Sequence, residues 1–185
     1  MLPLRCPHIV ETSRSGVEMA KLDQHYYRAC RKKNWATEDA EVSEDSGIEE
    51  TFLQVDGEGA LYPNMGFRDK KTWEWKRPPD VTTYKFNNEQ WVKGVNSGVA
   101  YVAQGVSINN EPGVFGYQDS FYFRLTKGTT VPGGLDVSQQ GRKNHFVIRC
   151  INDMRMTDFK GHLDTLAREA IAEAVKLKVA SLVFA

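Results

Sequence analysis

The sequence predicts an α+β fold. Residues 144–150 alternate apolar and polar side chains with the period of a strand. Residues 158–180 repeat apolar side chains at spacings of three and four, which is the period of an amphipathic helix. Shorter apolar stretches separated by Gly and Pro turns precede both segments. Several short strands between two helical regions, with long connections between the strands, indicate a mixed or split sheet.

The expected strand at residues 144–150 has two unlike faces. Its apolar side chains share one face and point to the core: Phe146, Ile148 and Cys150. The opposite face carries His145, Val147 and Arg149. One face therefore belongs to the core, while the other offers polar groups for chemistry.

The expected helix at residues 158–180 has a continuous apolar stripe, formed by Phe159, Leu163, Leu166, Ala170, Ala174 and Leu177. Thr157 is a suitable N-cap, and Asp158 complements the positive end of the helix dipole. Lys176 and Lys178 complement the negative end. The stripe predicts which side of the helix packs on the sheet.

The central strands are expected at residues 99–107, 120–125 and 135–137, bounded by turns rich in Gly and Pro. Residues 2–10 are expected to form at most an edge strand because two prolines interrupt them. Short elements are expected elsewhere in the first third: a helical turn at 16–22, a strand or helix at 25–30, an acidic loop at 37–50 and a strand at 51–55.

Residues 67–94 contain three tryptophans among many lysines and arginines, and Pro78-Pro79 divides the segment. Such a segment could stack bases and pair phosphates. The favoured interpretation is that Trp73, Trp75 and Trp91 cover the sheet while the lysines stay in water.

Size and composition indicate one globular domain over residues 1–185. A hydrophobic content of 41% is ordinary for a folded protein of this length. The formal net charge is +0, so no global field attracts nucleic acid or an anionic membrane, and such binding would have to be local. No run of about 18 apolar residues predicts a membrane span.

Cysteine usage points to a reducing compartment. The three cysteines, Cys6, Cys30 and Cys150, form neither an even disulfide set nor a metal-binding pattern. The amino terminus lacks the apolar core of a signal peptide, so we expect action in a cytoplasm. A Cys150–His145 nucleophile pair is disfavoured because the two residues fall on opposite strand faces. Walker, Rossmann and zinc-spacing patterns are absent from the sequence.

Six segments, in this order, resemble a toxin family: Tyr27-Arg28-Ala29, Gly59-Ala60-Leu61-Tyr62, Gly105-Val106-Ser107, Val131–Val137, His145–Ile148 and Gly161–Asp164. The family is that of type VI secretion effector toxins with a domain similar to the diphtheria-toxin group of ADP-ribosyltransferases. The resemblance implies a split, mixed β-sheet with flanking helices that binds NAD. It also implies that residues 67–94 are an insertion.

The resemblance implies catalytic roles for two residues. Ser107 matches the serine of the family's Gly-Thr-Ser strand, with Val106 in place of the threonine, and His145 matches the family's strand histidine. Transferases of this kind usually carry Glu where His145 stands. The imidazole would have to bond the ribose or act as a base, because a protonated ring beside a developing cation is unfavourable.

Three further residues are implied to bind NAD. Arg28 matches the basic residue of the first strand, with Arg5 as an alternative that lacks the local motif. An arginine suits a phosphate or ribose contact, and an aromatic ring suits stacking on nicotinamide, for which Tyr62 and Tyr101 are candidates. A metal is not implied.

The function implied is an intracellular toxin that uses NAD to ADP-ribosylate an unknown cellular acceptor. An immunity protein that blocks the cleft is an expected partner, and a membrane is not. The alternatives are an NAD glycohydrolase, a non-enzymatic RNA-binding or interaction module using the Trp and Lys segment, and an enzyme similar to RNA 2'-phosphotransferases.

Overall fold

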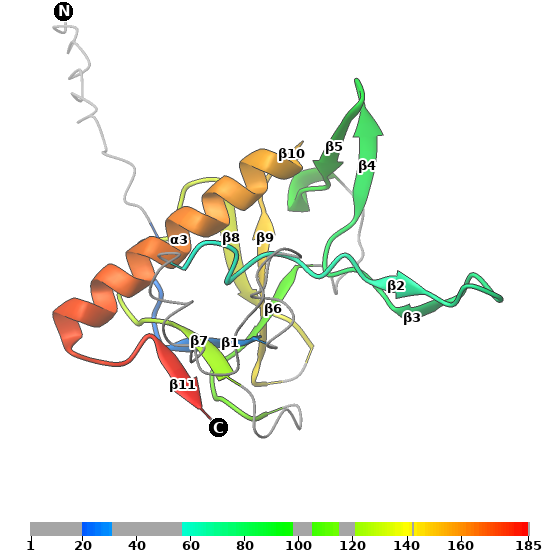
Figure 1. Cartoon of the computed structure of the whole chain (residues 1–185). Coiled ribbons are helices and arrows are strands. Elements are labelled where there is room, and N and C mark those ends of the chain that lie inside the picture. The colour runs from blue at the N-terminus through cyan, green and yellow to red at the C-terminus, as the bar shows by residue number, and fades with distance from the viewer. Residues whose placement is uncertain (1–19, 31–56, 98–104, 115–120, 142, 185) are drawn as a thin grey trace, which may run out of the picture.

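The computed structural model describes residues 20–30, 57–97, 105–114, 121–141 and 143–184 (Figure 1). Several expectations lie outside these residues: the segments 2–10, 37–50 and 51–55, residues 16–19 and 99–104, together with Arg5, Cys6 and Tyr101. The described end of the expected helical turn at 16–22 is not helical, because Lys21 forms an antiparallel bridge with Thr130.

The described elements follow the chain in the order β1 (Tyr26–Cys30), β2 (Phe67–Arg68), β3 (Trp75–Arg77), β4 (Thr83–Phe86), β5 (Glu89–Val92), η1 (Val95–Ser97), β6 (Val106–Asn109), β7 (Phe121–Leu125), β8 (Leu135–Gln139), β9 (His145–Cys150), β10 (Met154–Arg155), α3 (Met156–Leu177) and β11 (Leu182–Phe184). Residues 26–30, which the sequence left open between strand and helix, form a strand.

A six-stranded sheet with the order β11-β7-β1-β6-β9-β8 forms the body of the protein, and α3 lies across it (Figure 1). Every strand pairing in the described ranges is antiparallel, so the expectation of a mixed sheet is wrong for these ranges. The predicted α+β class is confirmed. Of the helices in these ranges, none is long and apolar enough to cross a membrane.

The sheet is weakly joined at its centre. Strands β1 and β7 pair at five positions, and β6 and β9 pair at four, but β1 and β6 share only the pair Tyr27 and Asn109 in the described register. The sheet is therefore split between β1 and β6 into two three-stranded halves.

The core fills the space between the sheet and α3. The helix stripe is completely buried at Phe159, Leu163, Leu166, Ala170 and Ala174, as the sequence predicted. From β9, Ile148 and Cys150 face this core and are buried, and Phe146 packs against it. Val147 points to the other face but is only 1% exposed, so the second face is also shielded from solvent here.

The ends of α3 differ from the expected ones. The helix begins at Met156, and its N-cap is Arg155 rather than Thr157, because β10 pairs with β5 and runs directly into the helix. At the other end, Lys178 adopts a left-handed conformation with φ of 54°, which ends the helix. Leu177 is 50% exposed, so the buried stripe stops before it.

Residues 67–94 form two hairpins that project from the body, β2–β3 and β4–β5 (Figure 1). The side chains of Trp73 and Trp75 are 72% and 45% exposed, so the expectation that the tryptophans cover the sheet is wrong for these two. Trp91 is half-buried and packs within its own hairpin on Tyr84 and Phe86.

Two leucines of α3 test this packing directly. Leu166→Ala removes a fully buried side chain and is expected to lower the free energy of unfolding by about 2–5 kcal/mol. Leu177→Ala, at a half-exposed position of the same helix, is expected to change it by less than about 1 kcal/mol. Urea denaturation measures both, and equal losses would contradict the assignment of the core.

Candidate functional site

Strands β6 and β9 bring Ser107 and His145 together. In the antiparallel register Ser107 pairs with Val147 and Asn109 pairs with His145, so Ser107 and His145 are diagonal neighbours on one face of the sheet. Ser107 Oγ lies 2.9 Å from His145 Nε2. Both predicted catalytic residues are therefore in direct contact.

The hydrogen bond of the second ring nitrogen of His145 determines which group donates in the contact between Ser107 and His145. His145 Nδ1 lies 3.1 Å from the carbonyl oxygen of Gln140, whose N–H donates in turn to the carbonyl oxygen of His145. A carbonyl oxygen only accepts, so the proton of the neutral ring lies on Nδ1. The lone pair of Nε2 then faces Ser107, whose hydroxyl donates to it. His145 is therefore oriented as a hydrogen-bond acceptor, and hence as a general base, toward the Ser107 hydroxyl.

Arg28 spans the split in the sheet. Its Nη1 donates to the carbonyl oxygen of Ser107 at 2.8 Å, and its Nη2 donates to the carbonyl oxygen of Tyr62 at 3.3 Å. Nη2 also forms an ion pair of 2.8 Å with Asp80. The side chain is 10% exposed, and both terminal nitrogens bond to protein oxygens. Arg28 therefore links β1 to the strand of Ser107.

Asp80 is the partner on which this arrangement depends. Its Oδ2 accepts the N–H of Asn64 at 2.9 Å besides the Arg28 guanidinium, and its own N–H donates to the carbonyl oxygen of Asn64 at 2.7 Å. Its carbonyl oxygen accepts the N–H of Gly105, directly before β6. The sequence shows Asp80 only as a turn residue after two prolines, because its partners are 16 to 52 positions away.

Tyr62 is anchored to α3. Its hydroxyl donates to Asp164 at 2.8 Å, and the other carboxylate oxygen accepts the N–H of Gly59 at 3.0 Å. Burial and the Asp164 carboxylate raise the pKa of Tyr62, so the hydroxyl stays protonated as a donor. Lys160 Nζ lies 4.7 Å from the ring centre. The tyrosine holds the turn at residues 57–62 against the helix.

Asn109 lies on the same sheet face as Ser107 and was not predicted. It is 5% exposed, and its Oδ1 is buried without a hydrogen-bond partner. A buried unpaired amide oxygen is costly unless a ligand or water uses it. Asn109 is two residues from Ser107 in the same strand, so their side chains share a face. This spacing is the sequence signal that could have identified Asn109.

Arg149 and Asp136 complete the polar face beside the Ser107–His145 pair. Arg149 Nη2 lies 2.8 Å from Asp136 and donates to Ser138 Oγ at 2.7 Å. These groups lie on β8 and β9, so they add charge and hydroxyl groups to the same face as His145.

Two other features lie apart from this site. A cavity of about 300 Å³ is lined by residues that include Leu22, Tyr26 and Val137, but none of Arg28, Ser107 and His145 lines it. The buried Cys150 thiol is on the core face, and burial raises its pKa to about 11. The described residues contain no group of three or more side chains able to hold a metal.

The comparison with known families identifies the chain. The family model described as Tse2 ADP-ribosyltransferase toxin matches residues 24–175 of the 185. The chain belongs to the Tse2 ADP-ribosyltransferase toxin family. The matched region runs from just before β1 to the last turns of α3, so it contains Arg28, Tyr62, Ser107 and His145. The resemblance to type VI secretion effector toxins is confirmed. No curated protein matches the chain.

The Arg28–Asp80 ion pair is expected to dominate the local stability. Asp80→Ala leaves a largely buried guanidinium without its carboxylate, which costs about 3–5 kcal/mol of the free energy of unfolding. Glu89→Ala is the matched control, because its ion pair with Arg155 is about half exposed and contributes about 1 kcal/mol or less. Denaturant unfolding measures both, and a loss for Asp80→Ala no greater than for Glu89→Ala would contradict this ranking.

Proposed function

We propose that the protein uses NAD to ADP-ribosylate a cellular acceptor, with Ser107 and His145 as its catalytic residues. The observation that supports this most directly is the 2.9 Å contact between Ser107 Oγ and His145 Nε2, beside the split of the sheet in a chain of an ADP-ribosyltransferase family.

The residues around the pair suit the groups of NAD. Ser107 offers a hydroxyl, and the unpaired Asn109 Oδ1 offers a buried acceptor for an amide or a ribose hydroxyl. When bound, NAD supplies an ADP-ribosyl group, because its bond to nicotinamide breaks with the electron pair leaving on nicotinamide. Ser107 and Asn109 carry no charge, so they do not repel the positive charge that develops on the ribose.

His145 receives the proton of the acceptor in this proposal. The acceptor nucleophile supplies the electron pair of the new bond, and its proton passes to the lone pair of Nε2 directly or through the Ser107 hydroxyl. The bond from Nδ1 to the Gln140 carbonyl keeps the ring in the tautomer that can take this proton.

Arg28 and Tyr62 act mainly as positioning residues in this proposal, although both began as candidates for NAD contacts. The donors of Arg28 are committed to Ser107, Tyr62 and Asp80, and the Tyr62 hydroxyl is committed to Asp164. Tyr101, outside the described residues, stays a prediction as the ring that stacks on nicotinamide.

We place the activity in the cytoplasm of a target cell, in one domain over residues 1–185 with residues 67–94 as an insertion. Family membership supports a cellular target. An immunity protein that covers the site is the expected inhibitory partner.

Alanine substitutions at the pair test the catalytic assignment. Ser107→Ala and His145→Ala are expected to lose growth inhibition on induced expression, and His145→Ala to slow nicotinamide release by about 10²–10⁴-fold. Ser97→Ala and His162→Ala are matched controls, because they remove the same side chains outside the candidate site.

The same proteins separate transfer from hydrolysis. With NAD labelled on its adenosine half, transfer leaves label on a macromolecule of a cell lysate, whereas a glycohydrolase releases only free ADP-ribose. Undiminished activity in both substituted proteins, at matched expression, would show that the site assignment is wrong.

A further inference from the structure

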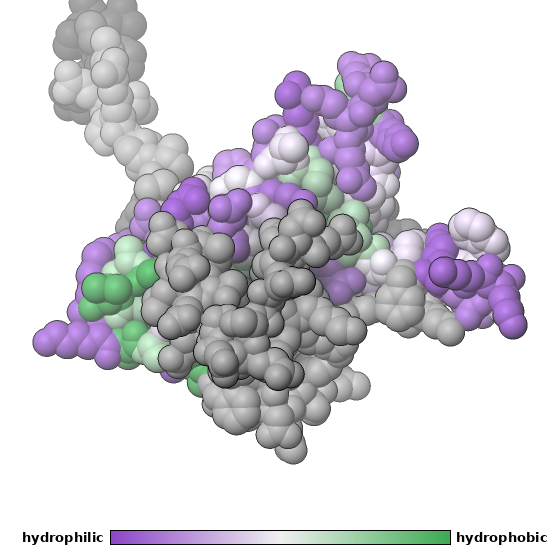
Figure 2. Space-filling model, in the orientation of Figure 1, coloured by the Kyte–Doolittle hydropathy of each residue, from purple (hydrophilic) through white to green (hydrophobic). Residues whose placement is uncertain are grey.

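The β2–β3 hairpin is the most unusual surface of the described chain. Residues 67–77, called here the basic hairpin, carry five basic and two acidic side chains and two tryptophans. The whole chain has a formal net charge of +0, so this hairpin concentrates positive charge that the rest of the protein balances. It projects away from the body (Figure 1), and its described surface is largely hydrophilic (Figure 2).

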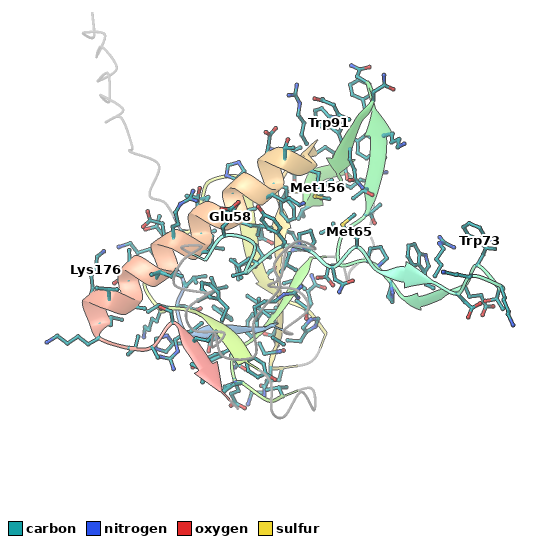
Figure 3. All side chains as sticks on the ribbon, in the orientation of Figure 1. Glu58, Met65, Trp73, Trp91, Met156 and Lys176 are labelled. Atoms are coloured by element: carbon teal, nitrogen blue, oxygen red, sulfur yellow. The ribbon has the colours of Figure 1, made fainter. Side chains whose placement is uncertain are left out.

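Trp73 lies at the far tip of the basic hairpin (Figure 3). Its side chain is 72% exposed, although burying a tryptophan is among the most favourable ways to remove apolar surface from water. Its φ is 59°, a conformation that is a true outlier for a bulky residue and costs about 1–3 kcal/mol. The chain therefore holds an aromatic ring in solvent despite two opposing costs.

The tip is organised to keep this conformation. Asp69 Oδ1 accepts the N–H groups of Lys71 and Thr72, and the Asp69 carbonyl oxygen accepts the N–H of Trp73 at 2.9 Å. Arg68 Nη1 donates to the carbonyl oxygen of Trp73 at 2.7 Å. The exposed ring is thus presented by a preformed turn, which lowers the entropy lost on binding.

The second tryptophan shows how a planar group is held on this hairpin. Trp75 is 45% exposed, and the Arg68 guanidinium carbon lies 4.0 Å from its ring centre. One planar cation already stacks there, while Trp73 stacks on no other side chain in the part of the chain that the structure describes. Lys70 and Lys71, both exposed, lie between Arg68 and Trp73 in the chain.

We propose that the basic hairpin binds single-stranded nucleic acid, with a base stacked on Trp73 and phosphates near Lys70 and Lys71. An aromatic platform combined with basic side chains is the arrangement that binds single strands. Tryptophan and arginine are enriched at protein interfaces, but lysine is depleted there, so the exposed Lys70 and Lys71 beside Trp73 favour a nucleic acid over a protein partner. A duplex fits less well, because its bases are not available for stacking on a side chain.

The base of the basic hairpin lies next to the candidate site. Asn64 and Asp80 flank the hairpin and bond to each other, and Asp80 pairs with Arg28 of the candidate site. A single-stranded nucleic acid bound to the hairpin would therefore lie on an element whose base is next to that site. The proposal concerns binding alone and does not depend on the proposed transfer reaction.

The test measures binding of the purified full chain to a fluorescein-labelled oligouridine RNA by fluorescence anisotropy, without NAD. Trp73→Ala is expected to weaken binding roughly 5- to 150-fold, and Trp73→Phe to retain most of it. Trp73→Gly adopts a positive φ without strain, so its loss of binding could not be ascribed to an unfolded tip.

The charge contribution has its own signature. In Lys70→Ala/Lys71→Ala, the slope of log K against log salt concentration is expected to fall by about 1.4. Lys127→Ala/Lys176→Ala removes the same charge elsewhere and is expected to leave the slope unchanged. Phe86→Ala, which removes an exposed aromatic from the other hairpin, is the control for Trp73→Ala.

Three results would overturn the proposal. The first is no binding of the RNA at low salt, and the second is binding that Trp73→Ala and Trp73→Gly leave intact. The third is equal competition by poly-glutamate or by a duplex of the same length. Equal competition by poly-glutamate would assign the hairpin to acidic polypeptides instead.

Discussion

The interaction on which the rest of the structure depends is the ion pair between Arg28 and Asp80. The six-stranded sheet is split between β1 and β6, where the described register has a single residue pair. Arg28 crosses this split to the carbonyl oxygen of Ser107, and Asp80 holds the guanidinium while its backbone bonds to Gly105 and Asn64. A charge with this little exposure is stable only when paired and hydrogen-bonded, so the pair fixes the distance between the two halves.

The consequence is a site made of parts with different tasks. The Ser107–His145 pair faces one side of the sheet, and the Gln140 carbonyl sets its tautomer. Arg28 and Tyr62, whose polar groups are occupied by protein partners, hold β6 and the turn at residues 57–62 in place. In the proposed division of roles, Arg28 positions the strand of Ser107 and does not offer its guanidinium to a ligand. Family membership gives the chain its reaction class.

Local patterns predicted the elements best where one residue period dominates. The stripe from Phe159 to Ala174 and the alternation in β9 were confirmed, because burial on one face imposes those periods. The predicted ends of α3 were wrong, at Thr157 and at Leu177. The pairing of β10 with β5 sets the start of the helix, and the left-handed Lys178 sets its end. Trp73 and Trp75 were misplaced because apolar character predicts burial, whereas residues 67–77 project into solvent.

By itself, the sequence determined the α+β class, the faces of β9 and α3, the toxin family and the identity of Ser107 and His145 as candidates. These follow from short-range periods and from ordered motifs, which can be read along the chain. Only the tertiary structure decided that the two side chains touch, that Asp80 holds Arg28 and that Trp73 is exposed. Each of these depends on strand register or on contacts between distant segments, and no local pattern encodes such a distance.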